Sequence, residues 1–225
     1  MKTSHYVEIG AAAIAAVVLA SSVSAQAPAA APAPATNPAH THIGHVMTQW
    51  KDTPASQGFL PAALADAKVA ATHAGYMQKS PDNLDSLKLH AGHVINALDP
   101  SIEMKGPGSG YGVKKAAAGA SQHAQLAAKS EGASKGVQTH AGHVTASLAN
   151  VAEWTDAAVA TAQKIRSATS AAEAAPLVAE LIAQTNNISN GLDANKDGTI
   201  GWQAGEGGLA QANQHMMLMM KGEGL

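Results

Sequence analysis

The chain has 225 residues, no cysteine and a formal net charge of −2 at pH 7. The absence of cysteine excludes disulfide bonds, thiolate zinc sites, iron–sulfur clusters and covalent haem attachment through CxxCH. The balanced charge, without a basic stripe, argues against nucleic acid as a partner.

The N-terminus has the three-part order of a secretory signal peptide. Lys2 supplies a positive charge, Ile9–Ala20 is an apolar run, and the small residues 23–25 form a cleavage site. The run is too short to span a bilayer, and no later segment is long and apolar enough to do so. We therefore expect residues 1–25 to be removed and the mature protein to be periplasmic or secreted. Residues 26–39 are rich in alanine and proline and predict an extended linker.

The remaining chain favours helices throughout. Alanine, the best helix former, is abundant, whereas aromatic residues are scarce and β-branched residues are scattered. Proline, glycine and aspartate clusters mark the breaks between candidate helices. These signals predict helices at 40–50, 59–79, 83–98, 111–130, 136–150, 152–168, 171–190 and 202–220.

One short motif, HxGHV, occurs three times, beginning at His42, His90 and His140. Each copy carries a second histidine three residues later, at His45, His93 and His143 respectively. On a helix this spacing places both imidazoles on one face, one turn apart. Imidazole is the commonest metal-ligating side chain, so the motif is typical of a helical metal or haem site.

The motif belongs to a longer repeat. A shift of 50 residues places His73, His90 and His93 on His123, His140 and His143. His73 and His90 stand at equal distances from the short turn at 80–83, so antiparallel helices would bring them to one level. The repeat therefore predicts two equivalent clusters, His73 with His90 and His93, and His123 with His140 and His143.

These observations predict an all-α fold: an antiparallel bundle of duplicated helical hairpins at 40–168, followed by a helix-loop-helix at 169–225. The histidine clusters suit zinc, copper or nickel. Bis-histidine ligation of b-type haem in an electron carrier is the alternative, and a structural or interaction protein with stabilising metal sites is another. No nucleophile elbow, triad or general base indicates an enzyme.

The C-terminal region carries a second metal motif, Asp193-Ala194-Asn195-Lys196-Asp197-Gly198-Thr199. It resembles the calcium-binding loop of the EF-hand family. The resemblance implies calcium ligands from Asp193, Asn195 and Asp197 and from the Thr199 carbonyl, with a sharp turn at Gly198. The family's bidentate glutamate is replaced by Ala204, and Glu206 comes two residues later. We therefore expect weak calcium binding that depends on Glu206 folding into the loop.

A third candidate is the thioether-rich segment His215–Met220, in which His215, Met216 and Met219 form a possible copper(I) ligand set. The sequence as a whole thus predicts an exported protein that binds metal ions for storage, buffering or delivery. It does not identify a protein partner.

Overall fold

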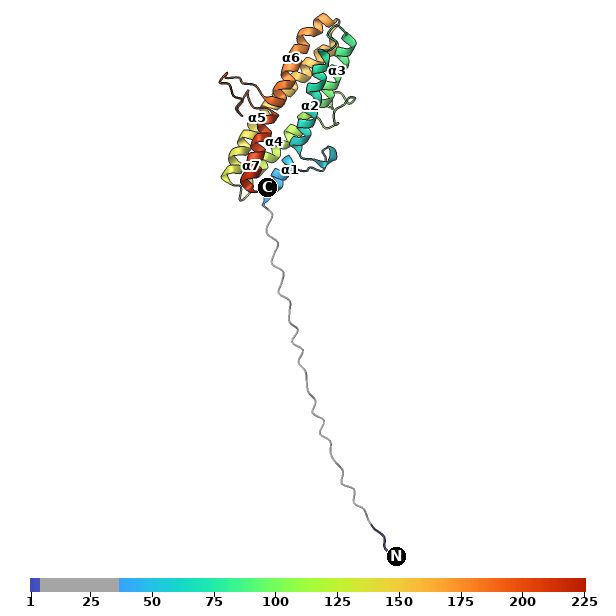
Figure 1. Ribbon diagram of the computed structural model, residues 1–225, viewed down its shortest axis with the longest axis vertical. Coiled ribbons are helices and arrows are strands. Elements are labelled where there is room, and N and C mark those ends of the chain that lie inside the picture. The colour runs from blue at the N-terminus through green and yellow to red at the C-terminus, as the bar shows by residue number, and fades with distance from the viewer. Residues whose placement is uncertain (5–36) are drawn as a thin grey trace. The chain divides into compact units, whose positions relative to one another are not determined.

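The structure, a computed structural model, describes residues 1–4 and 37–225 (Figure 1). Most of the predicted signal peptide and of the predicted linker lies outside the described residues. Across the described ranges the chain is all-helical, which confirms the predicted fold class. None of these helices is long and apolar enough to cross a membrane. The elements are α1 (Pro38–Met47), η1 (Pro54–Ser56), α2 (Phe59–Met77), α3 (Leu84–Leu98), α4 (Val113–Lys129), α5 (Lys135–Ser167), α6 (Ala171–Asn190) and α7 (Leu209–Glu223).

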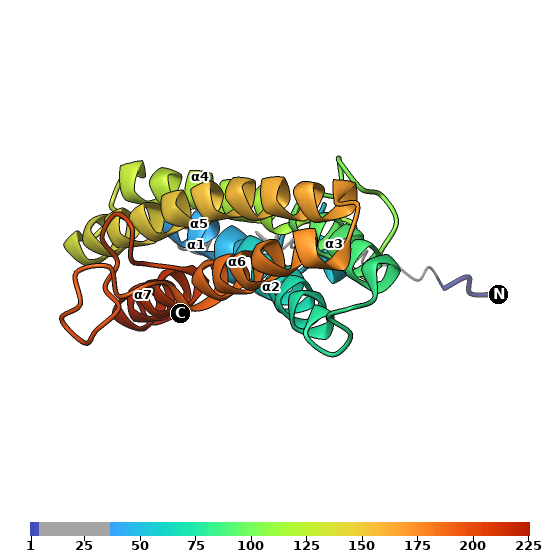
Figure 2. The same ribbon diagram turned by 90° about the horizontal axis from the view of Figure 1, so that it is seen from above.

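The long helix α5 organises the bundle. It has 33 residues and runs the length of the bundle, packing against α3, α4, α6 and α7 (Figures 1 and 2). Helix α4 runs antiparallel to it, with Lys114 near its start 2.7 Å from Asp156 of α5. Helix α7 is also antiparallel, because Ser134 before α5 donates to Glu223 at the end of α7. Helix α7 therefore flanks the N-terminal half of α5, and α4 extends past the middle of α5 to Asp156.

Helix α5 is continuous where the sequence predicted two helices, 136–150 and 152–168, so that prediction was wrong. Asn150 lies at the predicted break, but its side chain does not interrupt the helix. Its Nδ2 donates to the carbonyls of Gln203 (2.8 Å) and Gly207 (3.0 Å), and its Oδ1 accepts from the Gly205 amide (2.8 Å). Asparagine breaks helices by bonding its own backbone. Here the side-chain amide of Asn150 instead forms hydrogen bonds with the loop before α7.

Small residues allow the helices to approach closely. The buried core consists largely of alanine, valine, leucine and isoleucine, as the composition requires. At Gly119 of α4 an added Cβ would collide with the ring of Phe59 at the start of α2. Phe59 is 4% exposed and is the only phenylalanine in the chain. Glycine at this position therefore fixes how α2 and α4 pack.

The C-terminal helices belong to the same bundle as the histidine-rich part. Helix α6 packs against α2 and α5, and α7 packs against α5, so the regions on either side of residue 168 lie in one compact unit. The predicted helix at 202–220 begins later, at Leu209, and is preceded by a loop of residues 191–208. This loop contacts α5 at Asn150, and α7 then runs back along α5 so that its last residue, Glu223, lies beside Ser134.

Candidate metal centres

Each HxGHV motif lies near the beginning of a capped helix. Asn37 accepts from the Ala39 amide (2.9 Å), Asn83 from Ser86 (3.0 Å), and Ser134 from Val137 (3.1 Å). Such caps satisfy backbone donors that the first helical turn leaves free. The first histidine of each motif follows its cap by five to seven residues. The motif thus falls in the second turn, where the helical face that it presents is already fixed.

Nine histidines gather in three groups within the described residues, and in each group the ligand atoms all lie within 4.8 Å of one another. Every group combines the two histidines of one motif with a third from a different helix. We call these the first site (His42, His45, His123), the second site (His73, His90, His93) and the third site (His140, His143, His215).

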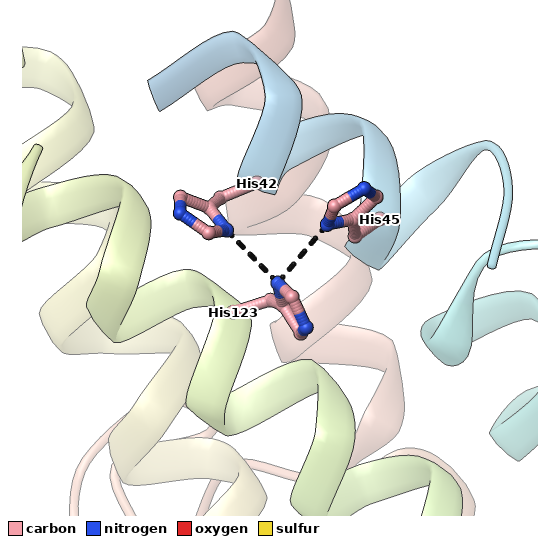
Figure 3. A group of neighbouring side chains, drawn as sticks. All are labelled: His42, His45 and His123. Carbon is pink, nitrogen blue, oxygen red and sulfur yellow. Dashed lines mark hydrogen bonds between the residues drawn. The ribbon is translucent and has the colours of Figure 1, made fainter. Parts of the chain in front are cut away.

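The three sites share one geometry. In the first, Nδ1 of His123 lies 2.9 and 3.2 Å from Nδ1 of the two motif histidines (Figure 3). In the second, Nδ1 of His73 lies 3.0 and 3.2 Å from its two partners. In the third, Nδ1 of His215 makes the corresponding distances of 3.1 and 3.4 Å. The third histidine approaches the first motif histidine more closely in every case.

The second site has the predicted composition, but the grouping predicted for His123 was wrong. His123 lies with His42 and His45 because its face of α4 packs against α1, where its ring stacks on Phe59 at 5.3 Å. The histidine that completes the third site is His215 of α7 instead.

His215 was assigned in the sequence to a copper(I) set with methionines, and the structure places it among imidazoles. Met216 and Met219 are 0% and 1% exposed in the core, where they fill space between helices. No sequence spacing links His215 to His140, because α6 and the irregular loop of residues 191–208 separate α7 from α5 along the chain. The sequence therefore named His215 as a candidate ligand but did not predict its neighbours His140 and His143.

The surroundings of six of the imidazoles favour their neutral form. Burial, and secondarily the neighbouring histidines, lower the pKa of six of the nine ligands, and the pKa of His215 falls to about 4. A protonated imidazole cannot ligate a metal, so these surroundings favour the binding form. The six are His45, His73, His90, His123, His143 and His215.

Hydrogen bonding alone does not account for the convergence. A neutral imidazole nitrogen carries either one proton or one lone pair. The central Nδ1 of each site faces two other Nδ1 atoms, so only one of its two short contacts can be a well-directed hydrogen bond. A cation between the three nitrogens would instead accept a lone pair from each. The arrangement is one that could hold a metal ion.

An aromatic ring flanks each site, and sequence analysis did not anticipate this. The Trp50 ring lies 4.8 Å from that of His45 and 4.9 Å from that of His123. Tyr76 lies 5.2 and 5.4 Å from two rings of the second site. Trp202, from the loop before α7, stacks on His143 at 3.9 Å with an interplanar angle of 16°. These rings restrict the orientation of the imidazoles and shield them from water.

The calcium-like loop is internally hydrogen-bonded. The Asp193 carboxylate accepts from the amides of Asp197 (3.2 Å) and Gly198 (3.0 Å), and Asp197 accepts from the amide and hydroxyl of Thr199. Gly198 has a φ of 88°, which suits the sharp turn expected there. Glu206, 4% exposed, accepts from the Gly201 amide at 3.1 Å.

The acidic side chains of this loop do not converge as the histidines do. In the described part of the chain the only close groups of three such ligands are the histidine sites, so Asp193, Asp197 and Glu206 form none. Calcium binding here stays a prediction from the motif.

The chain matches no protein-family model, no curated protein and no solved structure. No relative therefore supplies a function or a set of site residues. The functional argument depends on the geometry of the three sites and on the motifs in the sequence.

Proposed function

We propose that this protein is exported and binds transition-metal ions at its three tri-histidine sites, for storage, buffering or delivery. One observation carries the proposal: the same arrangement of three Nδ1 atoms occurs three times on three different pairs of helices. A single cluster of histidines on helix faces has many structural explanations. Three clusters with matching interatomic distances have one chemical explanation in common.

The distances support a bare metal ion. Zinc binds imidazole nitrogen at about 2.0–2.1 Å in tetrahedral geometry, which separates two ligand nitrogens by about 3.3 Å. In each site the central Nδ1 lies 2.9–3.4 Å from the Nδ1 atoms of the two motif histidines. Three protein ligands leave a fourth position for water or another ligand, and zinc, copper and nickel all accept imidazole.

The same distances argue against haem. Two axial imidazoles on opposite sides of an iron atom would be about 4 Å apart, twice the metal–nitrogen distance of roughly 2.0 Å. They would also have a flat macrocycle between them. The third nitrogen in each cluster has no place in such a complex. An absorption spectrum of the protein from its own host, with a Soret band or without one, distinguishes the two cofactors directly.

Reversible binding is favoured by the position of the ligands. Eight of the nine histidines are partly exposed and only His123 is buried. A metal held by three partly exposed imidazoles can leave without unfolding the core. Calcium at Asp193, Asn195, Asp197, Thr199 and Glu206 is the second part of the proposal and depends on the loop motif alone.

The proposal is tested by equilibrium dialysis of the mature protein against Zn²⁺ or Cu²⁺, followed by elemental analysis. We expect three equivalents per chain, and two after His90 and His93 are both replaced by alanine. Competition with a chromophoric chelator then separates the roles: exchange within minutes supports buffering or delivery, and retention over hours supports a structural metal. Fewer than one equivalent in the wild-type protein would refute metal binding at these sites.

A further inference from the structure

The first site borders a cavity of about 350 Å³ that the metal proposal does not explain. Its walls are His45, Gln49, Trp50, Lys51 and Ser56. The cavity thus includes one metal ligand and the aromatic ring that packs against two of them. Ligand pockets begin at roughly 300 Å³, so the space suits a small molecule.

The wall of this cavity is a tightly held loop. The Trp50 amide donates to the carbonyls of Ser56 (3.1 Å) and Gln57 (3.0 Å), and the Thr53 hydroxyl donates to the Trp50 carbonyl (2.8 Å). Ala55 and Ser56 both have a φ of 54°. That backbone region is disfavoured for residues with a Cβ and persists only where the surroundings impose it, often at ligand sites.

The polar groups on the wall suit an anion. Lys51 supplies an ammonium group, Ser56 a hydroxyl and Gln49 an amide, and none of the five lining residues carries a carboxylate. These groups stand beside a site whose three imidazoles would bind a tetrahedral ion as uncharged ligands and leave one coordination position open. A dication there would keep its full positive charge for a further ligand.

We propose that the metal at the first site takes a small carboxylate-type oxyanion as its fourth ligand, and that Lys51 and the residue 48–58 loop hold that anion. This inference rests on the proposed metal binding at the first site. The other sites are flanked differently. At the second, the Nζ of Lys79 lies over the Tyr76 ring at 4.6 Å, and at the third the Trp202 ring covers His143.

The test uses three variants that each keep one site, with both motif histidines of the other two sites replaced by alanine. Each variant is loaded with one equivalent of Cu²⁺ and titrated with acetate at constant ionic strength. Copper absorption and electron paramagnetic resonance report a new oxygen ligand. We expect saturable acetate binding in the first-site variant, with an affinity about tenfold above that of the other two, the size of one charge-assisted hydrogen bond.

Lys51→Gln in the first-site variant is expected to remove that tenfold advantage without changing copper stoichiometry. Lys51 is exposed, so this change leaves the fold intact. The matched control is Lys79→Gln in the second-site variant, which should leave acetate affinity unchanged.

Two outcomes would overturn the inference separately from the metal proposal. Equal acetate affinity at all three copper-loaded sites would show that the cavity is not a ligand site. An unchanged affinity after Lys51→Gln would remove the charge argument. Failure of the first-site variant to bind copper would refute this inference together with metal binding at that site.

Discussion

Replacing His123 with glutamine tests the unexpected grouping of the histidines. His123 is 8% exposed and supplies the central nitrogen of the first site, 2.9 and 3.2 Å from its partners. Glutamine preserves polarity and much of the volume but offers no imidazole lone pair. The variant should therefore lose metal at His42 and His45 and keep it at His140 and His143. The duplicated sequence alone predicts the opposite loss.

The size of the effect follows from mass action. A ligand at 100 times its Kd stabilises a protein by about 2.7 kcal/mol if it binds only the native state. For a domain of 150–250 residues each kcal/mol raises Tm by roughly 2–4 °C. Each site should therefore contribute about 5–11 °C of metal-induced rise in Tm. Residual binding to the HxxH motifs of the unfolded chain lowers this value.

The assay compares Tm with and without Zn²⁺, so that packing lost at His123 cancels between the two measurements. His123→Gln should lose about one third of the metal-induced rise. Adding His42→Ala and His45→Ala should cause no further loss, because all three residues serve one ion. Adding His140→Ala and His143→Ala should remove another third of the metal-induced rise in Tm, because these residues belong to a different site. The grouping is refuted if, in the His123→Gln background, the His140 and His143 changes cause no further loss of the metal-induced rise in Tm.

Three further predictions concern the fold and the loop. Burial lowers the pKa of His215 to about 4, so the unfolded chain binds more protons below pH 6.5. Without metal, the free energy of unfolding should therefore be highest above pH 6.5 and should decrease as the pH falls toward 4. A urea midpoint that does not change with pH would contradict this prediction. Calcium should raise Tm with a Kd of roughly 10⁻⁴–10⁻³ M, and Asp193→Ala should abolish the rise; an EDTA-insensitive wild-type melt would oppose calcium binding. Asn150→Leu should lower the free energy of unfolding by about 2–4 kcal/mol in urea titrations, because three hydrogen bonds to the loop are lost.

The sequence predicted the parts of the structure that depend on local spacing. The all-α class and most helix bounds follow from composition and break residues. The second site was predicted correctly because His73 and His90 lie on helices joined by a short turn. Equal distances from a turn are enough to bring two residues of a hairpin to one level.

Sites formed between distant helices were not predictable in this way. The partner of His123 depends on which face of α4 meets α1 and α2, and on α4 an added Cβ at Gly119 would collide with the ring of Phe59. The equivalent position 50 residues earlier is Val69, so the two copies of the repeat do not share this contact. The two copies therefore differ at a close contact between helices, and the spacing of the repeat alone does not predict how each copy packs.

The third site provides the strongest argument for the proposal that the histidines are metal ligands. Duplication explains why His123 is present, but it also implies that His123 should complete the cluster of His140 and His143. The His123 face of α4 packs against α1 instead. The third position beside His140 and His143 is occupied by His215, which lies outside the repeat. Its Nδ1 nevertheless stands 3.1 and 3.4 Å from its partners, close to the values in the other two sites. Common ancestry of the hairpins does not account for that agreement, whereas the proposed role of three imidazoles around one ion does.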